Sequence, residues 1–405
     1  MRQLFAQPLT RQRLFAILCV LALILVGCQS SSPQVISATP SRPPAVTSSG
    51  TPTVTPIPSA AVYTTTSAGH LYALNSGEGT LRWDTDIAGK GADANARALS
   101  VPVLADGTLY VAHGGDAISS ITASSGKLGA TFTIANAGIT WLGVVNKTIV
   151  AAERYGTALY GVNRDRGYIQ WQHRYPSLAG DPVVVGKTII LDEGDVLEGI
   201  DATYGNVIWR TTVANAVANG QFVATATRVY LLGADYPAPL LALDPTDGTI
   251  LWSVQLPFAA ASMTLGGSTL YVTSYKRSVT AIDGASGDVL HTTALGGGTD
   301  TFISHGASLP PPLIDSAMLY FAADSAGLNS GTRAITALGV NATASVWSYT
   351  LPGTAAISGL GISSGVLMIS ANGITALNSA TGMLLWYFSD PADVSATFSS
   401  PIIGA

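Results

Sequence analysis

The chain has 405 residues, of which 47% are hydrophobic and 11% are charged, so it holds ample material for a large core. Its formal net charge of −5 disfavours nucleic acid as a partner. It contains two cysteines, Cys19 and Cys28, both near the N-terminus.

Residues 1–27 have the pattern of a lipoprotein signal peptide. Three arginines precede the apolar run from Leu14 to Val26, which is too short to span a bilayer comfortably as a mature helix. The run ends in Leu25-Val26-Gly27-Cys28, which resembles the bacterial lipobox, where the cysteine is lipidated and becomes the new N-terminus. The alternative is an ordinary signal peptide with an incidental cysteine. We expect lipidation at Cys28 and an anchor on the outer face of the plasma membrane, or in an outer membrane if the cell has one.

Removal of this signal changes what the mature protein can do. With Cys19 removed and Cys28 lipidated, the folded part has no cysteine, which excludes disulfides, cysteine-bearing zinc sites and a cysteine nucleophile. Loss of the three arginines takes the formal net charge from −5 to −8.

Residues 28–59 are predicted to be a disordered tether. From Gln29 to Ser59, 20 of 31 residues are Ser, Thr or Pro, and Arg42 is the only charged residue. Such a segment buries too little apolar surface to fold. An extended chain of this kind, at about 3.1 Å per residue, reaches on the order of 100 Å from the lipid.

Beyond residue 60 the chain is built of internal repeats. In the stretch Ala242 to Trp252 (ALDPTDGTILW), a glycine follows the leucine at plus five and a tryptophan at plus nine. Eight copies of this frame occur, of which seven keep the glycine and six keep the tryptophan. The recurring positions of the frame are Gly79, Gly126, Gly167, Gly205, Gly248, Gly287 and Gly382, with Trp83, Trp171, Trp209, Trp252, Trp347 and Trp386.

Each repeat is predicted to contain four strands. An alternating run such as Leu109-Tyr110-Val111 precedes the frame, and a shorter strand opened by proline precedes that run, as in Val101-Pro102-Val103. Four-stranded repeats of about 40 residues are the signature of β-propeller blades. The chain ends in what resembles a first strand, Ser399 to Ile403, and the repeats begin at Ala61 with a second strand. We therefore predict an all-β, eight-bladed propeller over residues 60–405, closed by N- and C-terminal strands that share one blade.

The frame Ala-x-Asp-x-x-x-Gly-x-x-x-Trp resembles the tryptophan-docking motif of the PQQ-like repeats found in quinoprotein propellers. The resemblance covers the whole chain beyond residue 60. Within that family the chain is most similar to BamB-like barrel-assembly lipoproteins and related surface lipoproteins. It implies that the six motif tryptophans pack between adjacent blades and that the glycine turns cap the blade edges.

Two enzyme classes compete with a binding role. Quinoprotein dehydrogenases, which the resemblance brings in, carry a vicinal disulfide against the quinone and a calcium ion, and a cysteine-free mature chain has no such disulfide. The cluster from Asp192 to Asp195 is interpreted as the hairpin between the second and third strands of blade 4 rather than a calcium site. Gly361 to Gly365 has the letters of a nucleophile elbow, but a strand follows it directly, so a hairpin is expected there too.

The histidines and the irregular segments are the remaining candidates. His70, His113, His173, His291 and His305 lie in different repeats without short-range metal spacing, and His291 replaces a docking tryptophan, which suggests packing. The longest insertion, Gly296 to Pro312, contains Asp300 and His305 and is the candidate recognition loop; a longer linker is the alternative. Lys90 to Arg97 is a second irregular segment.

We therefore expect a non-catalytic, lipid-anchored, extracytoplasmic scaffold, monomeric and without a metal or cofactor, that binds protein partners in the cell envelope. The alternative is a small ligand in the central channel, either a PQQ-type quinone with calcium or a glycan, with a quinoprotein-related oxidoreductase activity as one form of it.

Overall fold

The computed structural model describes most of the chain from Ala60 to Gly404. The structure does not describe residues 1–59, 90–98, 136, 154–156, 214–219, 234–235, 275–277, 295–309, 316, 325–332, 343, 354 and 405. Cys28, the tether, Lys90 to Arg97, Asp300 and His305 therefore lie outside the described residues. The compact unit that holds all the strands runs from Pro56 to Ala405.

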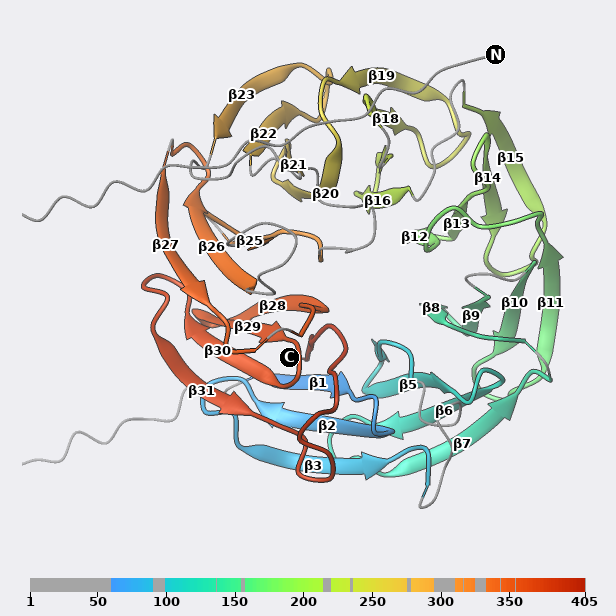
Figure 1. The fold of residues 1–405 in the computed structure, drawn as a ribbon. Helices are drawn as coiled ribbons and strands as arrows, with labels where there is room; N and C mark the ends of the chain where they lie inside the picture. Colours follow the sequence, from blue (N-terminus) through green and yellow to red (C-terminus); the bar gives the residue numbers. More distant parts are fainter. Residues whose placement is uncertain are drawn as a thin grey trace, which may run out of the picture. The chain divides into compact units, whose positions relative to one another are not determined.

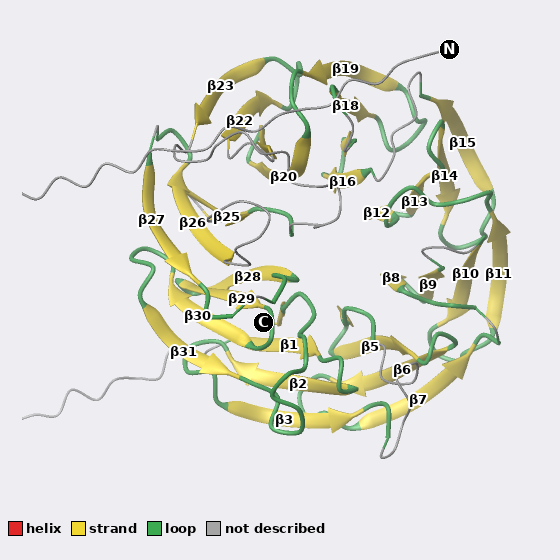
Figure 2. Cartoon of the chain, in the orientation of Figure 1, coloured by secondary structure: helices red, strands yellow, loops and turns green. Residues whose placement is uncertain are grey.

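The described strands form eight antiparallel sheets of four strands, and each sheet is one blade of a closed ring (Figure 1). No helix occurs among the described residues, so the ring consists of strands and their connections (Figure 2). The predicted all-β, eight-bladed propeller is confirmed.

In the first four blades the strands follow one another from the centre of the ring outward. Blade 1 is β32 (Ile402–Gly404), β1 (Ala61–Thr65), β2 (His70–Asn75) and β3 (Leu81–Asp86). Blade 2 is β4 (Val103–Ala105), β5 (Thr108–His113), β6 (Ala117–Thr122) and β7 (Leu128–Thr133). Blade 3 is β8 (Trp141–Val145), β9 (Thr148–Ala152), β10 (Ala158–Asn163) and β11 (Ile169–Arg174). Blade 4 is β12 (Val183–Val185), β13 (Thr188–Asp192), β14 (Val196–Asp201) and β15 (Val207–Thr212).

The other four blades follow the same order. Blade 5 is β16 (Gln221–Ala224), β17 (Val229–Leu232), β18 (Ala238–Leu243) and β19 (Ile250–Leu256). Blade 6 is β20 (Ala260–Gly266), β21 (Thr269–Ser274), β22 (Ser278–Asp283) and β23 (Val289–Ala294). Blade 7 is β24 (Leu313–Asp315), β25 (Met318–Asp324), β26 (Arg333–Gly339) and β27 (Ser345–Thr350). Blade 8 is β28 (Gly359–Ser363), β29 (Val366–Ser370), β30 (Ile374–Asn378) and β31 (Leu384–Phe388).

The core consists of eight apolar clusters, one at each blade-to-blade interface. Between blades 3 and 4, for example, Leu159 and Trp171 pack against Ile189, Leu191 and Ile200. Successive side chains of a strand point to opposite faces, so each middle strand contributes to the clusters on both of its sides. This explains why a middle strand such as β14 is buried along most of its length, whereas an outermost strand such as β15 mixes exposed with buried residues.

The ring is closed by pairing the two ends of the propeller. β32 pairs antiparallel with β1, so that Val62 lies opposite Ile403. The predicted sharing of one blade by N- and C-terminal strands is confirmed.

The meander divides the connections between two faces. In blades 2 to 8 the turn from the first to the second strand lies on the same face as the motif turn between the third and fourth strands; we call this the motif face. The turn from the second to the third strand lies on the opposite face, where the connection to the next blade also begins; we call this the connector face. The two longest connections between consecutive strands, from β3 to β4 and from β23 to β24, leave β3 and β23 at the connector face.

Candidate functional site

The motif tryptophans contact the next blade around the ring. The indole Nε1–H of Trp171 donates to the carbonyl of Ala202 over 3.1 Å, and the ring covers Gly205, whose φ is +73°. A Cβ on Gly205 would lie 2.5 Å from the indole, so both the backbone conformation and the close approach require glycine. The same indole-to-carbonyl bond is made by Trp83 to Ala123, Trp209 to Pro245, Trp252 to Gly284, Trp347 to Ser379 and Trp386 to Ser76. The glycines beneath these five rings are Gly126, Gly248, Gly287, Gly382 and Gly79.

Blades 2 and 6 lack the tryptophan and differ from each other. In blade 2 the ring of Phe132, two residues beyond the expected position, covers Gly167 of blade 3. In blade 6, His291 is exposed, so the expectation that it packs between blades is wrong. There, Thr293 instead donates its hydroxyl to the carbonyl of Ala342 over 3.1 Å.

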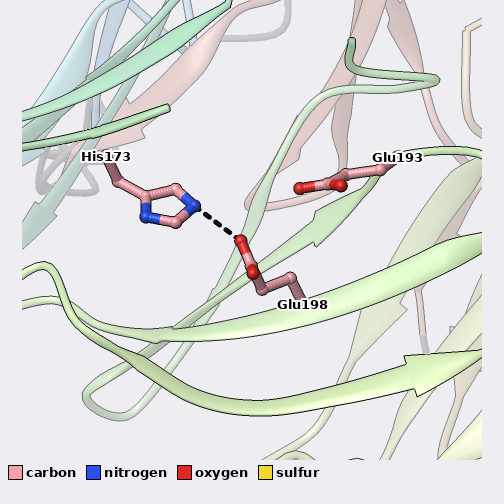
Figure 3. Close-up of side chains that lie close together, drawn as sticks. All are labelled: His173, Glu193 and Glu198. Atoms are coloured by element: carbon pink, nitrogen blue, oxygen red, sulfur yellow. Dashed lines mark hydrogen bonds and ion pairs between the residues drawn. The ribbon is translucent and has the colours of Figure 1, made fainter. Parts of the chain in front are cut away.

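At the interface of blades 3 and 4 a histidine and two glutamates lie close together. His173 extends from β11 of blade 3, Glu198 from β14 of blade 4, and Glu193 from the hairpin between β13 and β14 (Figure 3). The Nε2 of His173 lies 2.6 Å from Oε2 of Glu198. One potential ligand atom from each of the three side chains lies within 4.8 Å of the other two. Glu198 is fully buried, whereas His173 and Glu193 are partly exposed.

A guanidinium completes the cluster and controls its electrostatics. Arg210 on β15 donates from Nε to Oε1 of Glu198. Burial alone would raise the pKa of Glu198, but hydrogen bonds from His173 and Arg210 hold that pKa below its usual value. Burial raises the pKa of Glu193, and the charge of Glu198 raises it further. The two carboxylates therefore repel each other, and the positive charge of Arg210 attracts both.

Asp192, the last residue of β13, adds a buried carboxyl to the same blade. It is fully buried; its Oδ1 accepts from the N–H of Gly194 over 2.9 Å, and its Oδ2 has no partner. Burial raises its pKa to about 7. The interpretation of Asp192 to Asp195 as the hairpin of blade 4 is confirmed by the pairing of β13 with β14.

Sequence reasoning placed the hairpin but missed the cluster, because its members come from three separate strands and a turn. A signal was present in the repeat register. Glu198 pairs with Arg210 in β15, and seven residues of the other blades occupy the position equivalent to Glu198 without being carboxylates. They are Tyr72, Ser119, Tyr160, Leu241, Thr280, Thr336 and Thr375.

The predicted recognition residues, Asp300 and His305, lie outside the described residues. Gly361 to Ser363 are the end of β28, and Ser364 and Gly365 form the turn to β29, which confirms the hairpin and leaves no strand-to-helix elbow. Within the described ranges, no helical segment has the length and apolar character needed to cross a membrane.

Comparisons with known proteins identify relatives over the propeller. A family model described as "Outer membrane protein assembly factor BamB" matches residues 67–233 and 192–329. The outer membrane protein assembly factor BamB of Yersinia pestis is 25% identical over 213 residues, which are 47% of this chain and 50% of that protein. The BamB of Salmonella typhimurium matches with the same identity and coverage. The chain thus spans about half the length of the curated relatives it matches.

Solved structures support the fold alone. BamB from Moraxella catarrhalis superposes with a TM-score of 0.57 at 12% identity, covering 83% of this chain and 90% of that one. The dihydro-haem d1 dehydrogenase NirN gives a TM-score of 0.65 at 10% identity, covering 88% of this chain and 77% of that one. Quinohaemoprotein alcohol dehydrogenase from Comamonas testosteroni gives a TM-score of 0.56 at 14% identity, covering 72% of this chain and 66% of that one. An assembly factor and enzymes therefore share this architecture, and the architecture does not choose between them.

Proposed function

We propose a function from the premise that this chain belongs to the outer membrane protein assembly factor BamB family, whose model matches residues 67–233 and 192–329. The protein is a non-catalytic, lipid-anchored and monomeric scaffold that binds protein partners in outer membrane protein assembly. The family match is the observation that carries this proposal. The signal-like segment ending at Cys28 and the Ser/Thr/Pro-rich tether support an extracytoplasmic, anchored location.

The connector face is the proposed binding surface. A rigid ring fixes the ends of its strands, and recognition in such scaffolds usually lies in the connections. The two longest connections leave the sheets at this face, and exposed apolar side chains also lie there, including Tyr236 at 72% and Val394 at 74% exposure.

The alternative of a quinone and calcium in the central channel has less support. Both cysteines precede the propeller, so the disulfide of the dehydrogenases has no counterpart. Among the described residues, one group of three side chains could hold a metal, and it lies between blades 3 and 4, away from the innermost strands. We propose that the protein works without PQQ or calcium.

Site-specific photocrosslinking in living cells tests the scaffold role. A photoreactive residue replaces Tyr236 on the connector face or, as a matched control, Tyr204 on the motif face, where exposure is 75%. We expect Tyr236 to yield a discrete adduct with an envelope protein of outer membrane protein assembly and Tyr204 to yield none. Equal labelling from both positions, or no adduct from Tyr236, would contradict the proposal. In the same cells Cys28→Ser should release the chain from the membrane or leave its precursor unprocessed, and the adduct should weaken.

A further inference from the structure

We propose that His173, Glu193 and Glu198 form a binding site for a divalent transition-metal ion of the Zn²⁺ type, which joins blade 3 to the hairpin of blade 4. The site is independent of the scaffold role, and its three side chains are the one such group among the residues that the structure describes. Figure 3 shows how they lie relative to one another.

The three ligand atoms already lie close enough for one ion. Tetrahedral zinc binds imidazole nitrogen and carboxylate oxygen at about 2.0–2.2 Å, which places ligand atoms about 3.3 Å apart. For an ion to bind, the 2.6 Å distance between Nε2 of His173 and Oε2 of Glu198 must increase. The carboxylate oxygen of Glu193, now within 4.8 Å of the other two atoms, must move closer to them. Glu193 lies in a turn and is partly exposed, so its side chain can make this adjustment, and a water can fill the fourth position.

The surroundings of the cluster match the outer contacts of known metal sites. A ligating carboxylate is usually held by a second hydrogen bond that fixes its orientation. Arg210 occupies Oε1 of Glu198 and leaves Oε2 directed at His173. Glu193 and Glu198 repel each other, and the guanidinium of Arg210 is attracted to both carboxylates. A cation bound between them would be attracted to both carboxylates and would reduce their mutual repulsion.

The propeller itself does not require this cluster. Blade 3 shows a different arrangement: the hydroxyl of Tyr160, at the position equivalent to Glu198, donates to Glu153, at the position equivalent to Glu193, over 3.0 Å. In blade 4 the donor is replaced by a second carboxylate, Glu198, and the neighbouring blade 3 supplies a histidine, His173. The residues equivalent to His173 in the other blades, two beyond the docking position, are Thr85, Phe132, Thr211, Val254, Thr293, Tyr349 and Phe388, none of them a histidine or a carboxylate.

The ligand set points to zinc-like ions over calcium or magnesium. Imidazole suits zinc, copper and nickel, whereas calcium and magnesium prefer oxygen ligands throughout. Partial exposure of His173 and Glu193 gives the ion a route from solvent to the buried oxygen of Glu198.

Equilibrium dialysis of the tag-free full chain in detergent tests the site. The protein is stripped with a chelator and titrated with Zn²⁺ at about pH 7.5, and bound metal is measured by mass spectrometry. Co²⁺ serves as a second probe because its visible spectrum reports nitrogen and oxygen coordination. We expect about one ion per chain, with Kd raised at least about tenfold by His173→Gln or Glu193→Gln.

Two matched variants control for nonspecific binding. Glu153→Gln changes the equivalent hairpin carboxylate of blade 3, and His291→Gln removes an exposed histidine in blade 6. Both should leave Kd within about twofold. Zinc binding that is absent, or that is unchanged in both ligand variants, would overturn the proposal. If His173→Gln fails to fold, as judged by circular dichroism, Glu193→Gln at the partly exposed turn decides the question alone.

Discussion

At the scale of single residues, blade 4 places a carboxyl where the other blades do not. Asp192 is fully buried at the end of β13, and its Oδ2 has no hydrogen-bond partner. A buried polar atom without a hydrogen-bond partner loses its hydration on folding without compensation, which lowers the free energy of unfolding. The equivalent residues of the other blades are Thr65, Ala112, Ala152, Leu232, Thr273, Ala322 and Ser370.

We predict that Asp192→Ala raises the free energy of unfolding by about 1–3 kcal/mol, because it removes the unpartnered carboxyl. The measurement is denaturant unfolding of the full chain at about pH 8 with a chelator present. Asp195→Ala, in the exposed part of the same hairpin, should change stability by less than about 0.5 kcal/mol. A loss of stability in Asp192→Ala would show that this carboxyl supports the hairpin through Gly194 instead.

The sequence predicted the hairpin around Asp192 from repeat position, yet no pattern in it indicated that His173 reaches Glu198. The reason is physical. The frame determines which strand each residue occupies, but a contact between blades depends on which face of β11 meets which face of β14, and that requires the packed ring.

At the scale of the element, the recurrent unit is a turn covered by an aromatic ring of the preceding blade. The frame predicted the turn because a left-handed residue at a fixed place requires glycine. It did not predict Phe132, which lies two residues beyond the expected tryptophan position in blade 2. Residues two apart on a strand share a face, so a ring from the later position reaches the same gap over Gly167.

We predict that Gly205→Ala lowers the free energy of unfolding by about 1–3 kcal/mol more than Gly186→Ala does. Both glycines belong to blade 4 and have a positive φ, +73° and +60°, so backbone strain of about 1–2 kcal/mol is common to the two variants. The added methyl of Gly205→Ala also meets Trp171 at 2.5 Å, whereas that of Gly186→Ala meets nothing within 4 Å. Thermal unfolding of the two variants side by side measures the difference. Equal losses would mean that the ring over the turn moves aside freely.

At the scale of the whole molecule, ring closure was predictable because both ends of the propeller carry incomplete blades. What the sequence did not reveal is the buried contact that accompanies it. Asp390, in the last connection, is fully buried and accepts from the hydroxyl of Tyr72 over 2.7 Å and from that of Thr66 over 2.8 Å. These partners are more than 300 positions away in the chain, so no local pattern links them.

We predict that Asp390 and Tyr72 are energetically coupled across this closure. Tyr72→Phe removes one donor from a buried carboxylate and should cost about 1.5–3 kcal/mol. Asp390→Ala leaves two buried hydroxyls without their acceptor and should cost at least about as much. Since the second change removes little once the first is made, the double variant should be more stable than the sum of the single losses predicts, by on the order of 1–3 kcal/mol.

Denaturant unfolding of the two single variants and the double variant measures this coupling. Tyr387→Phe is the matched control, because its hydroxyl donates to Asn372 at an exposed site and its loss should change stability by less than about 0.5 kcal/mol. If the Tyr72 and Asp390 effects add without coupling, the pairing of β32 with β1 closes the ring without help from this contact. A coupling of the expected size would instead show that closure depends on a buried polar bond as well as on the shared blade.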